Sequence, residues 1–158
     1  MSDYRIRRAT PEDDAVLVYH RQAMFEDMGR EVDGPALDAA FRPWLHTHMR
    51  AGTYHAWLVE AQHDNDHSIV AGGGIMIIPW PPGPGYLNNR LAFVYNVYTE
   101  STHRHRGLGK LVMHAIHAFC RDEGIRMLAL NASEFGMPLY QSLGYTVTPS
   151  PMMFLALD

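Results

Sequence analysis

Apolar residues recur along the chain at two spacings, and each spacing predicts one type of element. Helical spacing of three and four residues predicts helices over Thr10 to Gly29 and Gly109 to Gly124, and a further helix that starts after Asp33-Gly34-Pro35 and runs toward Met49. Runs rich in β-branched and aromatic residues predict strands over Tyr4–Arg8, Tyr54–Ala61, Ile69–Ile78, Leu91–Glu100 and Met127–Leu130. A last helix should end at Leu143-Gly144, with one more strand or a broken pair within Tyr145–Leu157. This order of elements predicts a mixed α/β fold.

The composition is that of one globular domain, which we place over residues 1–158. The chain has 158 residues, of which 47% are apolar and 19% are charged. Its formal net charge of −4 gives no reason to expect a nucleic-acid partner. The longest uncharged apolar run, Ile69–Trp80, contains three glycines and is too short to span a bilayer, so no membrane partner is expected.

The single cysteine, Cys120, cannot form an intrachain disulfide, and the amino terminus has no apolar signal-peptide core. Both features favour a cytoplasmic location.

The candidate chemistry is concentrated in a glycine-containing loop between a strand and a strongly amphipathic helix. The loop reads Ser101-Thr102-His103-Arg104-His105-Arg106-Gly107-Leu108-Gly109-Lys110. Glycines at a helix start let the backbone approach an anion, which the free N–H groups of the first turn and the helix dipole then stabilise. Arg104, Arg106 and Lys110 add positive charge, so the loop predicts a phosphate site, and a pyrophosphate site in particular.

Two widespread phosphate motifs do not fit this loop. A nucleotide-hydrolase loop requires Gly-x-x-x-x-Gly-Lys followed by Ser or Thr, but Arg104 occupies its first position and Leu111 follows Lys110. A dinucleotide fingerprint requires Gly-x-Gly-x-x-Gly, but Val112 stands where its last glycine should be.

The pattern Arg-x-x-Gly-x-Gly over Arg104 to Gly109 resembles the acyl-CoA pyrophosphate loop of the GNAT superfamily of N-acetyltransferases. A second similarity lies further on, where Tyr140 is followed four residues later by Gly144 and then by the aromatic Tyr145. Both occur in the family's order, so the resemblance extends over nearly the whole chain. It implies a GNAT-like fold, with a mostly antiparallel central sheet splayed between strands four and five and about four flanking helices.

The resemblance also implies acetyl-CoA as co-substrate and a set of residues that bind it. The pantetheine arm would lie in the gap between strands four and five, paired with backbone groups of Val97, Tyr98 and Thr99. The pyrophosphate would lie on the loop formed by Arg104, His105, Arg106, Gly107, Leu108, Gly109 and Lys110. Asn131, at the end of the fifth strand, either binds the cofactor or caps the helix that follows.

Tyr140 is, by the same resemblance, the general acid that protonates the departing thiolate. The alternative is a buried aromatic residue that anchors the last helix. For the general base we select Glu100, at the end of a strand, over Glu26 and over Asn96 acting through a water. The plain alternative for Glu100 is a solvated charge beside the basic loop.

The function implied is transfer of an acetyl group to a primary amine of a small molecule or peptide, by direct attack in a ternary complex. A non-catalytic acyl-CoA-binding or sensing module on the same fold is the alternative. Trp80, Tyr86, Phe25 and Met28 are the residues we expect to line the acceptor pocket. No metal is expected, because the His-x-His and His-x-x-His pairs lack further Cys or carboxylate ligands. A homodimer is suggested only by analogy with relatives.

Overall fold

One five-stranded sheet organises the computed structural model, which describes residues 3–63 and 67–158. The strands lie in chain order as β1 (Tyr4–Arg8), β2 (Tyr54–Ala61), β3 (Ile69–Pro79), β4 (Arg90–Thr99) and β5 (Leu128–Ala129). The first four are antiparallel to their neighbours, and β5 is parallel to β4. The sheet is therefore mixed and mostly antiparallel, as predicted.

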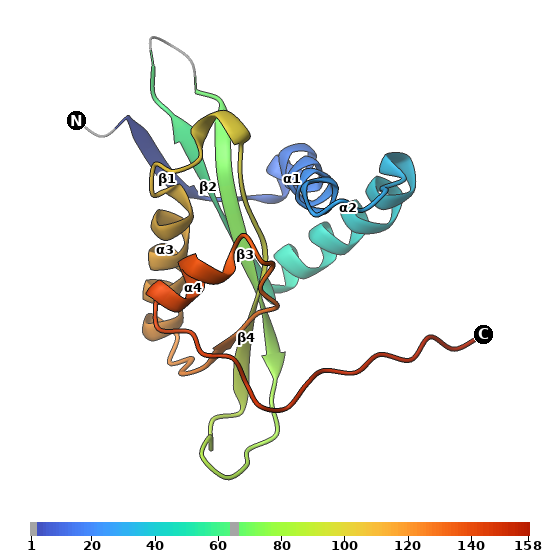
Figure 1. Cartoon of the computed structure of the whole chain (residues 1–158), viewed down its shortest axis with the longest axis vertical. Coiled ribbons are helices and arrows are strands. Elements are labelled where there is room, and N and C mark those ends of the chain that lie inside the picture. Colours follow the sequence, from blue (N-terminus) through green and yellow to red (C-terminus); the bar gives the residue numbers. More distant parts are fainter. Residues whose placement is uncertain (1–2, 64–66) are drawn as a thin grey trace.

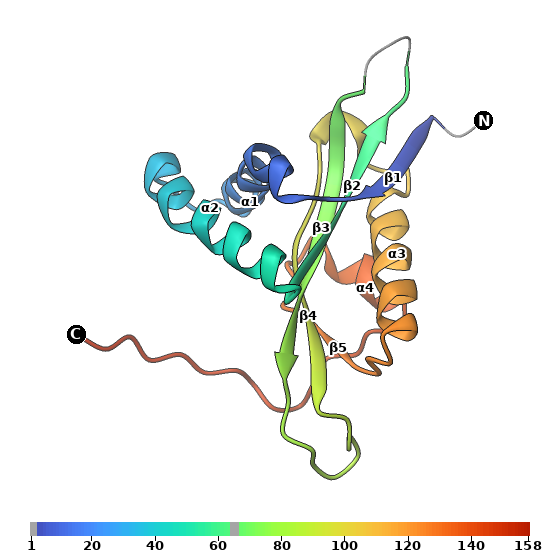
Figure 2. The same cartoon turned by 180° about the vertical axis from the view of Figure 1, so that it is seen from behind.

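Helices cover both faces of the sheet, with α1 (Asp14–Asp27) and α2 (Gly34–Ala51) on one side (Figure 1). The other face carries α3 (Leu108–Asp122) and α4 (Met137–Ser142), as the reverse view in Figure 2 also shows. Short 3-10 turns, η1 (Pro11–Asp13) and η2 (Ser101–His103), precede α1 and α3. No helix within the described ranges is long and apolar enough to cross a membrane.

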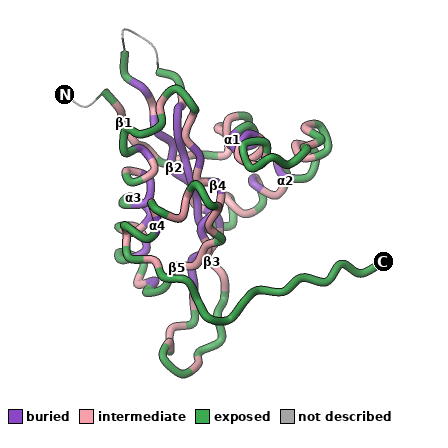
Figure 3. The backbone as a smooth tube through the Cα atoms, in the orientation of Figure 1, coloured by how far each residue is buried: buried purple, intermediate pink, exposed green. Residues whose placement is uncertain are grey.

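Alternation along β2 builds two cores, one on each face of the sheet. Tyr54 and Leu58 pack toward α1 and α2, whereas Trp57 and Val59 pack toward α3. This follows from the two-residue period of a strand, which sends successive side chains to opposite faces. The buried residues accordingly run along the strands between the two helical layers (Figure 3).

A β-bulge interrupts β4 where it faces β3. Gly72 pairs with Tyr98 and Gly74 pairs with Tyr95, so Asn96 and Val97 together lie opposite Gly73. Asn96 has a φ of 60°, a left-handed conformation that is uncommon for a residue other than glycine. The buried Asn96 amide holds this conformation by accepting from Arg21 Nη1 at 2.7 Å and donating to Tyr54 Oη at 2.9 Å.

The β4–β5 pairing is short, which leaves most of this edge of β4 uncovered. Only Ala92 and Phe93 pair with β5, through Leu128 and Ala129. Beyond Phe93, no described strand pairs with β4 on that side. The predicted splay between strands four and five therefore lies alongside the bulge.

The strand predicted within Tyr145–Leu157 is wrong. Residues 146–158 form no strand and are exposed, and they run away from the body of the molecule (Figure 1). Ordered packing ends at Tyr145, whose hydroxyl lies 2.8 Å from His117 Nε2. Pro149 and Pro151 lack the backbone donors that a sheet ladder requires, which opposes strand pairing in this segment.

Candidate active site

A cleft of about 740 Å³ lies between the uncovered edge of β4 and the starts of α3 and α4. Its walls come from five parts of the chain: the end of α1, β4, the glycine loop with the start of α3, the turn before α4, and α4 itself. The residues predicted from sequence that line it are Val97, Tyr98, Thr99, Arg104, His105, Gly107, Leu108, Gly109, Lys110 and Tyr140.

Positive-φ residues shape the glycine loop at the start of α3. His105 has a φ of 60° and Gly107 a φ of 77°, and Gly107 is the N-cap of α3. No side chain of residues 3–63 or 67–158 caps this helix start, so its first N–H groups are available to an anion. Lys110 lines the cleft beside them and adds a positive charge.

Arg104 connects the glycine loop to the end of β4 and to α1. Its Nε donates to the Thr99 carbonyl oxygen at 3.0 Å, and its guanidinium forms an ion pair with Asp27 of α1. Because Asp27 already balances this charge, the helix start and Lys110 are left as the main attraction for an anion. Arg106 extends elsewhere: it donates to Tyr4 Oη at 3.2 Å and does not line the cleft.

Tyr140 enters the cleft from α4 and keeps its proton. Its side chain is only 9% exposed, and burial raises the pKa of the phenol to about 12. Among the described residues its hydroxyl has no hydrogen-bond partner. Gly136 makes room for the ring, since a Cβ there would lie 2.9 Å from Tyr140 Cε2. Pro138, in the first turn of α4, needs no helical hydrogen bond for its missing N–H.

Glu100 and Asn131 are not among the residues that line the cleft. Glu100 follows the end of β4, where its carboxylate accepts from Tyr98 Oη at 3.3 Å. Asn131 is exposed in the segment after β5, and neither residue lines the cleft. Ser133 lines it instead, and its Oγ accepts from Gly136 N at 3.1 Å.

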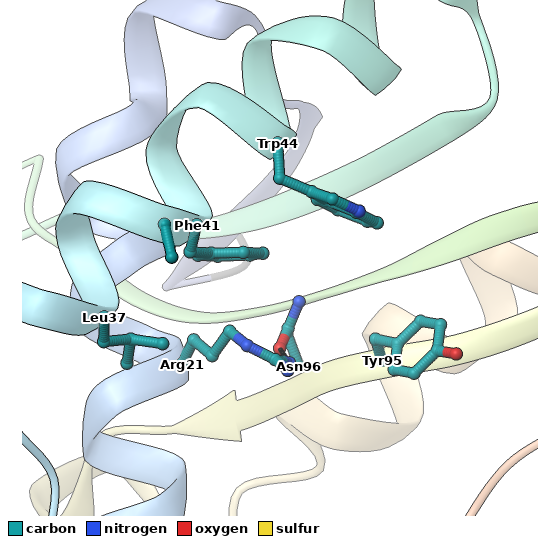
Figure 4. Close-up of a pocket in the computed structure, with 7 residues that line it drawn as sticks. Arg21, Leu37, Phe41, Trp44, Tyr95 and Asn96 are labelled. Carbon is teal, nitrogen blue, oxygen red and sulfur yellow. Dashed lines mark hydrogen bonds between the residues drawn. The ribbon is translucent and has the colours of Figure 1, made fainter. Parts of the chain in front are cut away.

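A second cavity, of about 350 Å³, lies on the other side of the bulge, between α1, α2 and β4. Its walls are formed by Arg21, Leu37, Ala40, Phe41, Trp44, Tyr95 and Asn96. Phe41 and Trp44 stack with ring centroids 5.6 Å apart. The Arg21 guanidinium lies 4.9 Å from the centroid of the Phe41 ring, with Asn96 beside it (Figure 4).

The residues expected from the sequence to line an acceptor pocket do not line this second cavity. Trp80 and Tyr86 belong to the β3–β4 loop, at the opposite end of the sheet from the glycine loop (Figure 1). Met28 lines the larger cleft, and Phe25 stacks on Arg21 from outside the cavity. The sequence did not indicate this cavity, because Leu37, Phe41 and Trp44 have the spacing of an ordinary helix core face.

No three His, Cys, Asp or Glu residues in the described part of the chain lie close enough to hold a metal ion.

Comparison with known proteins places this geometry in a family. The family model "Acetyltransferase (GNAT) family" matches residues 19–145. A GCN5-related N-acetyltransferase from Ralstonia eutropha JMP134 is 31% identical, over 96% of this chain and 98% of that one, with a TM-score of 0.86. A predicted acetyltransferase from Clostridium acetobutylicum, solved with acetyl-CoA, is 24% identical over 98% and 96% of the two chains, with a TM-score of 0.84.

The fold extends to more distant proteins. Glucosamine-6-phosphate N-acetyltransferase from Arabidopsis thaliana is 19% identical over 99% of this chain and 100% of that one, with a TM-score of 0.67. The glycine loop, the uncovered edge of β4 and Tyr140 all lie within the matched residues 19–145, and this chain belongs to the acetyltransferase (GNAT) family.

Proposed function

We propose that this chain transfers an acetyl group from acetyl-CoA to a primary amine, by direct attack within a ternary complex. One observation carries the proposal: the buried phenol of Tyr140 lines the same cleft as the uncovered β4 edge and the start of α3. The cleft thereby combines an extended edge for pairing, a helix start for an anion and a proton donor.

The residues present suit acetyl-CoA along the whole cleft. No described strand pairs with this edge of β4 beyond Phe93, so backbone groups of Val97, Tyr98 and Thr99 can pair with an extended, amide-containing arm. The Thr99 carbonyl oxygen already accepts from Arg104 Nε, so the amide groups of this edge other than that oxygen are the ones offered to the arm. The start of α3 and Lys110 suit the pyrophosphate. Acetyl-CoA would bring the activated acetyl group as a thioester.

Tyr140 acts, in this proposal, on the departing sulfur. A bond forms between the amine nitrogen and the acetyl carbon, the carbon–sulfur bond breaks, and the sulfur receives a proton or hydrogen bond from the phenol. The attacking nitrogen gives up one proton to solvent, from which Tyr140 recovers its own. A backbone N–H at the β4 bulge stabilises the negative charge that builds up on the acetyl oxygen.

The position of Cys120 supports direct attack over an acyl-enzyme. Cys120 is the only cysteine in the chain. It lies on α3, is 1% exposed and belongs to the core between α3 and the sheet. Burial raises its pKa to about 11, so it is not a ready nucleophile at neutral pH.

The test is CoA release from acetyl-CoA, followed with a thiol reagent across a panel of amines. We expect amine-dependent release by the wild type and a fall of about tenfold or more in kcat for Tyr140→Phe. Tyr86→Phe is the matched control, because Tyr86 also loses a hydroxyl but lies outside both cavities.

Each alternative predicts its own result. Tight acetyl-CoA binding without release by any amine would support the binding or sensing module. Release by Tyr140→Phe at the wild-type rate would remove Tyr140 from the mechanism. No acetyl-CoA binding would overturn the proposal altogether.

A further inference from the structure

The second cavity contains a cation without a counter-charge. Arg21 Nη1 donates to Asn96 Oδ1 at 2.7 Å, and the guanidinium lies 4.9 Å from the ring centroids of both Phe25 and Phe41. These partners are neutral, and no described carboxylate forms an ion pair with Arg21. By contrast, Arg7, Arg42 and Arg104 each pair with one or more acidic residues.

We propose that Arg21 binds the carboxylate of the acceptor, and that the acceptor is an apolar or aromatic α-amino acid. This inference rests on the proposed acetyl transfer and names its substrate class. A guanidinium has five donors in a planar fork that matches a carboxylate, and the single hydrogen bond to Asn96 leaves the others available. Burial lowers the pKa of Arg21, which shows that the charge is desolvated without full compensation.

The rest of the cavity selects the side chain of the acceptor. The α2 residues that line the cavity are all apolar: Leu37, Ala40, Phe41 and Trp44. Of these, Phe41 contacts the Arg21 guanidinium (Figure 4). The described lining contains no Asp, Glu or His, so a polycationic acceptor such as an aminoglycoside or a polyamine finds no opposite charge there. A volume of about 350 Å³ suits an acceptor the size of one amino acid.

The position of Arg21 also brings the amine to the reaction. Asn96, its hydrogen-bond partner, is in the β4 bulge, and the next residue, Val97, lines the larger cleft. A carboxylate on Arg21 therefore holds the α-amino group of the same molecule beside the bulge. A nearby cation disfavours the protonated form of an amine. Arg21 therefore also helps to free the lone pair of the acceptor amine, because the described lining of the cavity supplies no carboxylate base.

The test compares three phenyl-bearing acceptors that differ at the carboxylate, and adds spermidine as a polycationic acceptor. CoA release is measured with L-phenylalanine, L-phenylalanine amide, phenethylamine and spermidine, for the wild type, Arg21→Gln and Arg30→Gln. We expect L-phenylalanine to exceed phenethylamine in kcat/KM by about tenfold or more in the wild type, as a hydrogen-bonded charge requires. Arg21→Gln should abolish that preference, because KM should rise by about tenfold or more for L-phenylalanine relative to phenethylamine. A loss shared equally by both acceptors would report only the contact of Arg21 with Asn96 in the bulge.

Arg30→Gln is the matched control, because Arg30 also stacks on Phe25, at 5.1 Å, yet does not line the cavity. It should keep the preference of the wild type. Far-ultraviolet circular dichroism of both variants checks folding, and Arg21→Lys supplies a second variant that keeps the charge but loses the planar fork.

A binding measurement separates the failure of this inference from failure of the proposed function. Trp44 lines the cavity, so quenching of tryptophan fluorescence reports L-phenylalanine binding without any chemistry. Binding that Arg21→Gln weakens supports the inference even if no acetyl transfer occurs. Equal use of phenethylamine and L-phenylalanine, preference for spermidine, or fluorescence binding unaffected by Arg21→Gln would overturn it. A Tyr140-dependent reaction with spermidine would overturn it while leaving acetyl transfer intact.

Discussion

Burial sets the protonation state of several single residues near the two cavities. Tyr140 stays a neutral phenol and Cys120 a neutral thiol because burial disfavours their charged forms. His20, on α1, is 1% exposed and packs 5.0 Å from the ring centroid of Tyr98. Its Nε2 has no hydrogen-bond partner among the described residues. Tyr98, which lines the cleft, therefore packs against a histidine that must remain neutral in the folded protein.

His20 should make the stability of the fold depend on pH. Burial lowers its pKa from 6.5 to about 4 in the folded protein, so the unfolded chain takes up the proton first. Above pH 6.5, the pKa of His20 in the unfolded chain, this residue should not make the free energy of unfolding depend on pH. As pH falls from there toward about 4, the pKa in the folded protein, the free energy of unfolding should fall by about 2–3 kcal/mol. Urea unfolding of the wild type and His20→Met between about pH 7 and 4.5 measures the difference. Parallel losses in both proteins would show that His20 does not titrate in this way.

At the level of elements, the glycines of β3 determine how closely the neighbouring chains approach. A Cβ on Gly73 would lie 2.9 Å from Val112 Cγ1, and one on Gly74 would lie 2.3 Å from Tyr54 Oη. Tyr54 in turn holds Asn96 in the bulge. The geometry of β4 between the two cavities thus depends on the absence of side chains at Gly73 and Gly74 of β3.

Gly74→Ala should destabilise the protein and disturb the bulge. The added methyl would force Tyr54 from its buried position, at a cost of about 1–3 kcal/mol in the free energy of unfolding, measured with denaturant. Gly83→Ala is the control, because a Cβ there meets nothing within 4 Å and its φ is not positive. If the two variants were equally stable, the tight contact with Tyr54 would not constrain the sheet.

The same elements explain what the sequence could and could not predict. The amphipathic pattern of α3 and the β-branched runs of β2 and β4 are local, so these elements were predicted within a few residues. The bulge was not predicted, because the φ of Asn96 depends on Gly73, Tyr54 and Arg21, which are distant in the chain. The roles of Glu100 and Asn131 stay predictions, since the structure places both outside the cleft.

On the scale of the whole molecule, the carboxyl-terminal segment contrasts with the rest of the chain. Met153, Phe154, Leu155 and Leu157 are 83–88% exposed, whereas the core residues of the sheet, such as Leu58, Val59 and Ile75, are fully buried. These side chains bury almost no area within the chain, so they contribute little to its folding free energy.

Removal of residues 152–158 should therefore leave the fold nearly unchanged. We expect Tm to shift by no more than about 2 °C in differential scanning calorimetry, because no core contact is lost. Static light scattering should fall in the truncated protein, since an exposed apolar segment promotes association. A much larger loss of Tm would mean that these residues are packed in solution.

The two cavities share no lining residue, although both border the bulge of β4. α2 contributes only to the smaller one, through Leu37, Ala40, Phe41 and Trp44, while the larger takes its walls from the glycine loop, α3 and α4. Substitutions on α2 can thus reshape the smaller cavity without contact with the larger. For evolution as for design, this separation makes the domain modular: a library randomised on α2 can change what the smaller cavity binds while the residues of the larger cleft stay as they are.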